Sequence, residues 1–373
     1  MGREYYLNLL KDSLENLKRD LGENLALVGP KNIGKSYLLK EFVSSVKDSE
    51  VVPVYIDLER AAMSPEEFCF NFISQTCYWF KGGKQEDYKK MDYLLKLNLG
   101  AASKHVKELK NELEKIKPDH NLLVDIAFKF PEALAKQEKK KVLLIIDEFQ
   151  NILDLNNFEK IKDIVKLFNS LQLENVKFVV AGSSIQQMRE ICTDFKIENI
   201  GYFEFDGTKK LVQSLVPKIS DKEVDRIFKL SLGHPYFITA ICNRYNETKD
   251  VDQAYIIETL SKQGLIYQAC NQMYNNSLSR ARGKTLLMSI MNVLVYEEGL
   301  RLSEISRRIY RQSPVTKNLL SRLISVDLLA LKENRYYFID PVLKFWLSKV
   351  LRGLEFDGVS DEEIDKLVKE IGS

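Results

Sequence analysis

The eight residues from Gly29 to Ser36 carry the clearest chemical signal in this sequence of 373 residues. They read Gly-Pro-Lys-Asn-Ile-Gly-Lys-Ser, so two glycines frame the segment and a lysine and a serine follow the second one. Glycines at this spacing let the backbone turn tightly and aim successive N–H groups at phosphate oxygens, while the dipole of a following helix adds positive charge. The segment therefore predicts a loop that holds the phosphates of a nucleotide.

The side chains of this loop have separate expected roles. Lys35 is expected to reach the β- and γ-phosphates, and the Ser36 hydroxyl is expected to ligate Mg²⁺. The alternative is a turn that matches by chance, but an apolar strand (Leu25–Val28) precedes the loop and a helical segment follows it, as phosphate binding requires. The predicted nucleotide-binding residues here are Gly29, Pro30, Lys31, Asn32, Ile33, Gly34, Lys35, Ser36 and Tyr37.

Two adjacent carboxylates, Asp147 and Glu148, follow the apolar run Val142–Ile146. A strand that ends in this way places Asp147 at the carboxyl edge of a sheet, where it is expected to hold Mg²⁺ together with Ser36. Glu148 is then placed to orient and deprotonate an attacking water molecule. The alternative is that both acids cap the next helix, but the upstream loop favours hydrolysis of a nucleotide.

A third polar pair, Ser183 and Ser184, follows the apolar run Phe178–Ala181 and Gly182. One of these hydroxyls is expected to contact the γ-phosphate or the attacking water and so to distinguish ATP from ADP. A serine that caps the following helix is the compatible alternative. The predicted catalytic group is thus Lys35, Glu148, Ser183 and Ser184.

The elements that must position these residues alternate along the first 206 residues. The predicted strands are Leu25–Val28, Val51–Leu58, Val142–Asp147, Val176–Ala181 and Ile200–Phe205. Apolar residues at helical spacing predict helices over 6–21 and 158–171, among others. Strands that alternate with helices indicate an α/β fold with a parallel sheet, and strands rich in Val, Ile and Leu favour burial on both faces.

A helical insertion is predicted over about 81–135, where Lys, Glu and Leu dominate the composition. Its charged, leucine-striped helices either pack on their own domain or form an arm that binds a partner. After residue 206 the strands stop, and residues 207–283 are predicted to form a wholly helical lid domain.

The segment 284–350 predicts three helices followed by a two-stranded hairpin about Glu333–Asn334, which is the pattern of a winged helix-turn-helix. Its second and third helices and its hairpin carry more Arg and Lys than acidic residues. Both duplex DNA binding through the third helix and a regulatory, protein-docking role remain open. The tail, 351–373, contains a predicted helix capped at Ser360 and has no assigned role.

Composition narrows the classes of protein. The net charge is only +2, so contact with nucleic acid must be local, and no apolar run reaches the ~20 residues that cross a bilayer. The five cysteines lie far apart, and the three histidines offer no zinc-ligand spacing. We expect a cytoplasmic protein with reduced thiols, no membrane association, and no metal other than nucleotide-bound Mg²⁺.

Five motifs in their order resemble archaeal-type ATPases of the STAND class, which are signal-transduction relatives of AAA+ proteins. They are Gly2-Arg3-Glu4, the loop Gly29–Ser36, Leu143–Gln150, Ala181–Ser184 and Gly233–Pro235. The resemblance implies a P-loop sheet in the order 5-1-4-3-2, a helical lid and a C-terminal winged helix. It also implies ATP as the nucleotide, with Arg3 near the base or ribose and His234 and Pro235 closing over the adenine or the phosphates.

One departure concerns the arginine finger of such proteins, because the stretch Phe195–Tyr202 contains no arginine. Lys196 and Arg189 are the substitutes that the sequence offers, so slow or partner-dependent hydrolysis is expected. The resulting prediction is a Mg²⁺-dependent ATPase that switches with ATP or ADP and has a protein partner, with oligomerisation left open. The alternatives are an initiator-like DNA-binding protein and a non-hydrolysing, nucleotide-bound adaptor.

Overall fold

The computed structural model describes residues 2–59, 64–158, 161, 163–281, 283–357 and 361–372. These residues form two compact units. The N-terminal unit comprises Arg3–Pro30 and Gly34–Ile200, and the C-terminal unit comprises Gly2, Lys31–Ile33 and the chain from Gly201 onward. The division lies between Ile200 and Gly201, six residues before the predicted boundary at 206.

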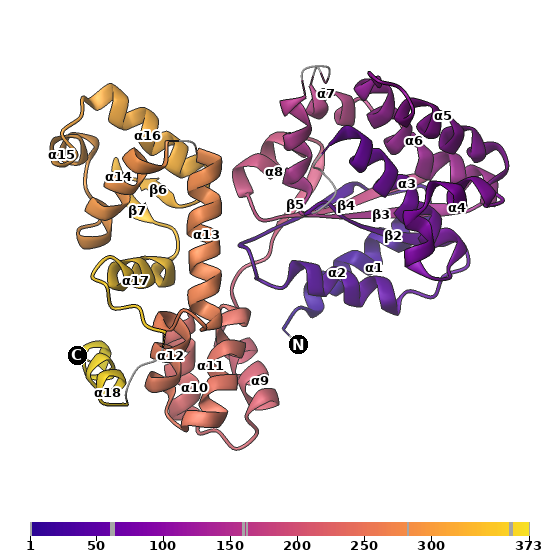
Figure 1. Cartoon of the computed structure of the whole chain (residues 1–373). Coiled ribbons are helices and arrows are strands. Elements are labelled where there is room, and N and C mark those ends of the chain that lie inside the picture. Colours follow the sequence, from indigo (N-terminus) through magenta and orange to yellow (C-terminus); the bar gives the residue numbers. More distant parts are fainter. Residues whose placement is uncertain are drawn as a thin grey trace. The chain divides into compact units, whose positions relative to one another are not determined.

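A five-stranded sheet organises the N-terminal unit (Figure 1). Its strands are β1 (Asn24–Val28), β2 (Val51–Asp57), β3 (Lys141–Asp147), β4 (Val176–Gly182) and β5 (Phe195–Asn199). Their order is β2-β3-β4-β1-β5 and every neighbouring pair is parallel, which confirms the predicted order 5-1-4-3-2 read from the other edge. The central strands are buried on both faces, as their Val, Ile and Leu content requires.

The predicted position of the fifth strand is wrong. The strand covers Phe195–Asn199, not Ile200–Phe205, and it lies at the sheet edge beside β1. An edge strand is only half-buried, so charged Lys196 and Glu198 alternate with apolar residues and leave no continuous apolar run. Ile200 only continues the pairing by one bond, donating its N–H to Val28 O at 2.7 Å.

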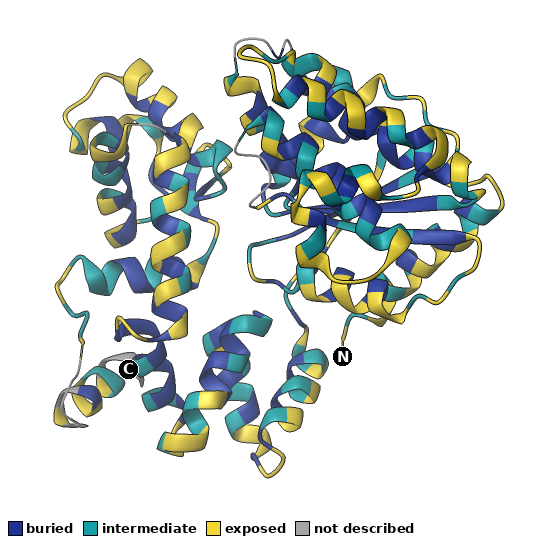
Figure 2. Ribbon diagram, turned by 45° about the vertical axis from the view of Figure 1, so that its right-hand side comes forward, coloured by how far each residue is buried: buried dark blue, intermediate teal, exposed yellow. Residues whose placement is uncertain are grey.

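Helices cover both faces of this sheet (Figure 1). They are α1 (Glu4–Lys18), α2 (Lys35–Ser45), α3 (Pro65–Lys81), α4 (Met91–Lys96), α5 (Ser103–Leu113), α6 (His120–Glu138), α7 (Ile164–Asn169) and α8 (Ile185–Ile191). Helices α1 and α2 pack on one face, whereas α3 and α6 pack on the other. In Figure 2 the strands are dark blue, and yellow, exposed residues lie on the outward sides of these helices.

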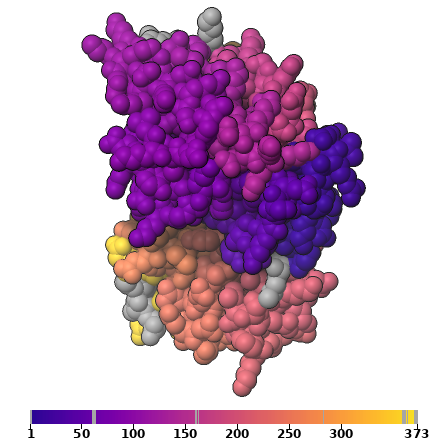
Figure 3. Space-filling model, turned by 90° about the vertical axis from the view of Figure 1, so that its right-hand side faces the viewer, coloured from indigo at the N-terminus to yellow at the C-terminus, as the bar shows by residue number. Residues whose placement is uncertain are grey.

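The predicted insertion is helical from α3 to α6 and packs on its own unit. Tyr88, Leu94, Val106 and Leu109 are buried in the same hydrophobic core as the sheet, whereas Ile116 is exposed. The purple side chains of this insertion form a continuous outer surface in the space-filling view (Figure 3). The structure therefore supports packing on the unit itself.

The helix predicted over 158–171 is wrong in extent. The chain instead forms a 3₁₀ helix, Phe149–Asn157, and then the short α7. Asp163 starts α7 at this point because its carboxylate accepts the N–H groups of Val165 and Lys166 at 3.1 and 3.2 Å.

In its described residues, the C-terminal unit consists of helices and one hairpin. Its elements are α9 (Phe205–Leu215), α10 (Asp221–Ser231), α11 (Pro235–Thr248), α12 (Val251–Leu260), α13 (Leu265–Ala281), α14 (Lys284–Tyr296), α15 (Leu302–Arg308), α16 (Ser313–Ser325), β6 (Leu329–Lys332), β7 (Arg335–Phe338), α17 (Pro341–Val350) and α18 (Asp361–Gly372). One core joins side chains from Phe203 to Leu347. The predicted lid and the three-helix-plus-hairpin segment thus share a core.

Two predictions about the whole chain can be compared with these elements. Ser360, the predicted cap of the last helix, lies outside the described residues. Within the part of the chain that the structure describes, no helix combines the length and apolarity needed to cross a membrane.

Candidate functional site

The phosphate-binding loop connects β1 to α2, as the motif predicts. Gly34 precedes α2 with a φ of 97°, a left-handed conformation that favours glycine. Gly29 is required for a different reason, because a Cβ at this position would lie 2.3 Å from the carbonyl oxygen of Ile200. Tyr37, in the first turn of α2, is 73% exposed.

Lys35 is buried although it carries a charge. Its ammonium group donates to the carbonyl oxygens of Gly29 and Pro30 at 2.7 and 2.8 Å. These bonds hold the ammonium against the loop and compensate for its loss of water. A phosphate in the loop would offer this group a stronger, oppositely charged acceptor.

Ser36 and Asp147 meet beside the loop, as predicted. Asp147 ends β3, is almost fully buried, and accepts hydrogen bonds from the hydroxyls of Ser36 and Tyr55, the latter at 2.9 Å. Burial raises the pKa of Asp147, and the carboxylates of Glu148 and Asp57 raise it further, while the two hydroxyls oppose the shift. A cation beside Asp147 would offset the unfavourable energy of burying its negative charge.

The oxygen donors of Ser36 and Asp147 suit Mg²⁺, which prefers hard oxygen ligands. Among the described residues no group of three or more His, Cys, Asp or Glu side chains could hold a metal ion. Mg²⁺ at phosphate sites is usually held by one or two protein oxygens together with phosphate oxygens and water, and Ser36 and Asp147 would supply the protein oxygens.

Glu148 occupies a strained position directly after β3. Its φ is 50°, in the left-handed region, and its N–H donates to Asp147 Oδ1 at 3.0 Å. Its carboxylate accepts a hydrogen bond from the Ser183 hydroxyl at 3.0 Å and another from the Gln150 amide. The predicted general base and the predicted phosphate sensor therefore contact one another.

The two serines after β4 have different surroundings. Ser183 belongs to the Glu148 cluster, whereas Ser184 precedes α8 without a side-chain capping bond. The Ser184 hydroxyl is buried and has no hydrogen-bond partner among the described residues. Ser183 is thus the serine that the structure brings together with Glu148, whereas Ser184 occupies the N-cap position of α8 without a capping hydrogen bond from its side chain.

Sequence reasoning missed two residues of this site, Tyr55 and Gln150. Tyr55 lies in β2 and holds Asp147, and its own pKa is raised by burial, so its hydroxyl remains a donor. Gln150 connects the ends of β3 and β4. Its amide nitrogen donates to Ser183 Oγ at 3.2 Å, and its amide oxygen accepts the Ser183 N–H at 3.2 Å. Two features of the sequence could have identified them. Apolar and polar residues alternate toward the end of β2, and a polar residue follows Glu148 and Phe149.

The lid residues lie in the C-terminal unit, together with Lys31–Ile33 of the loop. His234 is buried, stacks on Phe237 at a centroid distance of 4.1 Å, and places Nε2 3.2 Å from the carbonyl oxygen of Lys31. Pro235 opens α11, as predicted. Gly233 approaches the backbone of Phe203, whose N–H donates to Gly233 O at 2.8 Å.

The remaining predicted residues lie in the N-terminal unit. The Arg3 guanidinium is 5.7 Å from the centre of the Tyr6 ring, and burial lowers its pKa. Lys196 lies in the edge strand β5, 3.0 Å from the Glu198 carboxylate, and Arg189 lies in the last turn of α8. Within the described part of the chain, the hydrogen bonds of the Glu148 cluster join Glu148, Gln150 and Ser183 and involve neither of these cations.

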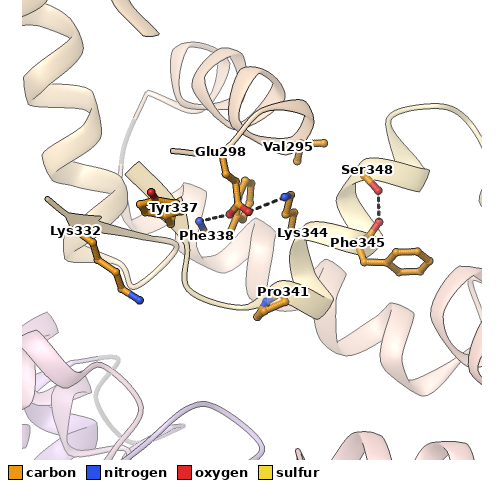
Figure 4. Close-up of a pocket in the computed structure, with 9 residues that line it drawn as sticks. All are labelled: Val295, Glu298, Lys332, Tyr337, Phe338, Pro341, Lys344, Phe345 and Ser348. Atoms are coloured by element: carbon orange, nitrogen blue, oxygen red, sulfur yellow. Dashed lines mark hydrogen bonds and ion pairs between the residues drawn. The ribbon is translucent and has the colours of Figure 1, made fainter. Parts of the chain in front are cut away.

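A separate hollow of about 560 Å³ in the C-terminal unit contains none of the predicted residues (Figure 4). Glu298 at its centre pairs with Lys344 at 2.6 Å and accepts the N–H of Phe338 at 2.8 Å. Through these two contacts, Glu298 connects β7 to α17, and its carboxylate is already paired.

Comparison with known proteins agrees with this geometry. A family model described as an ATPase domain predominantly from Archaea matches residues 3–241. An uncharacterized ATP-binding protein of Methanocaldococcus jannaschii is 26% identical over 263 residues, which are 67% of this chain and 71% of that protein. The solved structure of a Walker-type ATPase from Pyrococcus abyssi has a TM-score of 0.63 at 18% identity and covers 92% of this chain and 95% of that one.

Proposed function

This chain belongs to the family of ATPase domains found predominantly in Archaea, and from that premise we propose that it binds Mg²⁺-ATP and hydrolyses it slowly as a nucleotide-controlled switch. The observation that carries the proposal is the meeting of Ser36 with buried Asp147 beside the lysine of the phosphate loop. This set of one ammonium, one hydroxyl and one carboxylate fits a metal-bound triphosphate.

Each residue has a part in the proposed reaction. Loop N–H groups and Lys35 hold the phosphates, Ser36 and Asp147 hold the metal, and Tyr55 keeps Asp147 in place. Bound Mg²⁺ would supply neutralisation of the charge that develops on the phosphate oxygens. Glu148 takes a proton from the attacking water, and Ser183 contacts the γ-phosphate.

The contacts of Glu148 support slow hydrolysis. Its Oε2 atom already accepts hydrogen bonds from Ser183 and Gln150, so this oxygen is occupied and must exchange a bond before it can accept a proton from water. A γ-phosphate that draws the Ser183 hydroxyl toward itself would release one of these bonds. The base would then become active only when ATP is in place.

The contact between His234 and Lys31 supports the switch. Because the loop carbonyl of Lys31 lies 3.2 Å from His234 Nε2, a change in the loop on nucleotide binding reaches the start of α11. We assign the helices α14–α16 and the β6–β7 hairpin to a winged helix, and the chain to the STAND class, on the sequence motifs and this order of elements. A protein partner would accelerate hydrolysis.

Two variants test the site. Lys35→Ala is expected to abolish ATP binding, because it removes the charge that faces the phosphates. Glu148→Gln is expected to bind ATP like the wild type and to lower the rate of phosphate release by about 100-fold or more. Isothermal titration with ATP and Mg²⁺, together with a phosphate-release assay, measures both.

Equal loss of binding in both variants would contradict these roles. The same assays distinguish the alternative that the bound nucleotide only stabilises the fold and is not hydrolysed. Wild-type protein that releases no phosphate and retains tightly bound ADP through purification would favour that non-hydrolysing adaptor.

A further inference from the structure

Helix α16 presents one side to the core and leaves the other uncovered. Thr316, Leu319, Leu320 and Leu323 are buried, which fixes the rotation of the helix on its unit. The opposite side, which we call the α16 face, consists of exposed Pro314, Val315, Lys317, Asn318, Ser321 and Arg322. No acidic residue occurs between Ser313 and Ser325.

The spacing of the exposed side chains on the α16 face suits contact with a groove of duplex nucleic acid. Lys317, Asn318 and Ser321 are neighbours on one side of a helix, and they carry a cation, an amide and a hydroxyl. These are groups that pair with base edges, and an exposed valine such as Val315 suits a thymine methyl group. A helix of 13 residues is about 20 Å long, and the major groove is wide enough to admit it.

The turn before α16 adds cations and an exposed ring. Tyr310 is 87% exposed and has a φ of 53°, in a tight turn closed by the hydrogen bond from Arg311 N–H to Ser306 O at 3.0 Å. Arg307 and Arg311 are both exposed on either side of it. A ring this exposed contributes little to the core and is accessible to a partner at the surface.

Nearby acids are mostly engaged elsewhere. Glu297 pairs with Arg308 at 2.7 Å, and Glu304 accepts the N–H of Arg301 at 2.7 Å at the start of α15. Two further acids lie in this segment, namely exposed Glu333 at the tip of the hairpin, beside exposed Lys332, and half-buried Asp327 after α16. The balance of charge around the α16 face is therefore positive, although the chain as a whole carries only +2.

We propose that the α16 face and the turn before it form a binding surface for duplex DNA. Arg307 and Arg311 would contact backbone phosphates, and Lys317, Asn318 and Ser321 would contact base edges in the major groove. This surface is separate from the phosphate-binding loop and does not depend on the proposed ATPase activity.

The test is fluorescence anisotropy of a labelled 24-base-pair duplex of mixed sequence, titrated with the full chain without nucleotide at 50–200 mM KCl. We expect a dissociation constant in the micromolar range at the lowest salt, because a duplex of mixed sequence carries no selected site and non-specific binding falls in that range or is weaker. The double variant Arg307→Ala/Arg311→Ala should bind at least tenfold more weakly. Its salt dependence should be shallower by about 1.8 in logarithmic slope, which corresponds to two lost phosphate contacts.

The matched control is Lys218→Ala/Lys222→Ala, which removes two exposed lysines elsewhere in the same unit and should bind like the wild type. Lys35→Ala should also retain DNA binding, so a failure of the ATPase proposal leaves this test intact. Absence of binding at 50 mM KCl, or equal loss in the control, overturns the proposal. Polyglutamate that displaces the duplex as efficiently as unlabelled DNA also overturns it and favours an acidic protein partner.

Discussion

Asp147 is a buried carboxylate whose ionised form the nucleotide-free fold does not favour. Burial and the neighbouring carboxylates of Glu148 and Asp57 raise its pKa, and two hydroxyls compensate only in part. We therefore expect Asp147→Asn to raise the melting temperature of the nucleotide-free protein by about 2–4 °C, which corresponds to about 1 kcal/mol in a domain of this size. The same variant should lose the stabilisation that Mg²⁺-ATP gives the wild type.

The pH dependence of this effect has a definite sign. A carboxylate with a raised pKa in the folded state contributes stability at low pH and loses it as the pH rises above the unfolded value of about 4. The difference in melting temperature between Asp147→Asn and the wild type should therefore be small near pH 4 and grow toward pH 8. Differential scanning calorimetry measures it, with Asp119→Asn, an exposed helix cap, as the control. A difference that shrinks with rising pH would contradict the assignment.

The residues of the phosphate site could be predicted to different degrees. Lys35, Ser36, Asp147 and Glu148 follow from the sequence because loop spacing and strand ends fix where their backbones lie. Gln150 could not be predicted, since its role depends on β3 and β4 being neighbours and on Gly182 leaving room for its amide. A Cβ at Gly182 would lie 2.6 Å from Gln150 Oε1.

At the scale of elements, the central strands and the edge strand β2 were predictable, whereas the edge strand β5 and the short α7 were not. The central strands β1, β3 and β4 are continuous apolar runs because both of their faces are covered, and β2, at one edge of the sheet, still has mostly apolar residues from Val51 to Ile56. The edge strand β5 and the short α7 have weaker patterns, because one side of each meets water and local caps decide where they start. Their positions depend on partners that the sequence does not show.

The turn between α10 and α11 contains a glycine that the packing requires. Gly233 has a φ of 78°, and a Cβ there would lie 2.1 Å from the carbonyl oxygen of Phe203. We expect Gly233→Ala to lower the free energy of unfolding by about 3 kcal/mol or more, because backbone strain and a clash with backbone combine. Urea unfolding followed by circular dichroism measures the loss.

Gly353 provides a matched comparison in the same unit. Its φ is 72°, almost the same as that of Gly233, but no atom lies within 4 Å of the Cβ position. Gly353→Ala should therefore cost only the left-handed strain, about 1–2 kcal/mol. Equal losses in the two variants would show that the approach of Phe203 has no energetic importance.

At the scale of the whole molecule, the described residues form two large hydrophobic cores, one in each unit. Each core has its own tryptophan, since Trp79 lies in α3 and Trp346 in α17, and the chain contains only these two. The Trp79 indole donates to Tyr55 O at 3.0 Å, and the Tyr55 hydroxyl contacts Asp147, whereas Trp346 is buried among the helices of the C-terminal unit. The two fluorophores therefore report on separate cores.

We expect urea to unfold the two cores at different midpoints, because a chain with separate cores need not unfold in one step. The single-tryptophan variants Trp346→Phe and Trp79→Phe resolve the two transitions by fluorescence. Mg²⁺-ATP at about 100 times its dissociation constant should stabilise the nucleotide-bound unit by about 2.7 kcal/mol, which moves the Trp79 midpoint by roughly 1 M urea. The Trp346 midpoint should move much less, since Lys35, Ser36 and Asp147 all lie outside the core that it reports. Coincident midpoints that shift together would show that the chain unfolds as one cooperative body. If Mg²⁺-ATP shifted neither midpoint, the proposed nucleotide site would be contradicted.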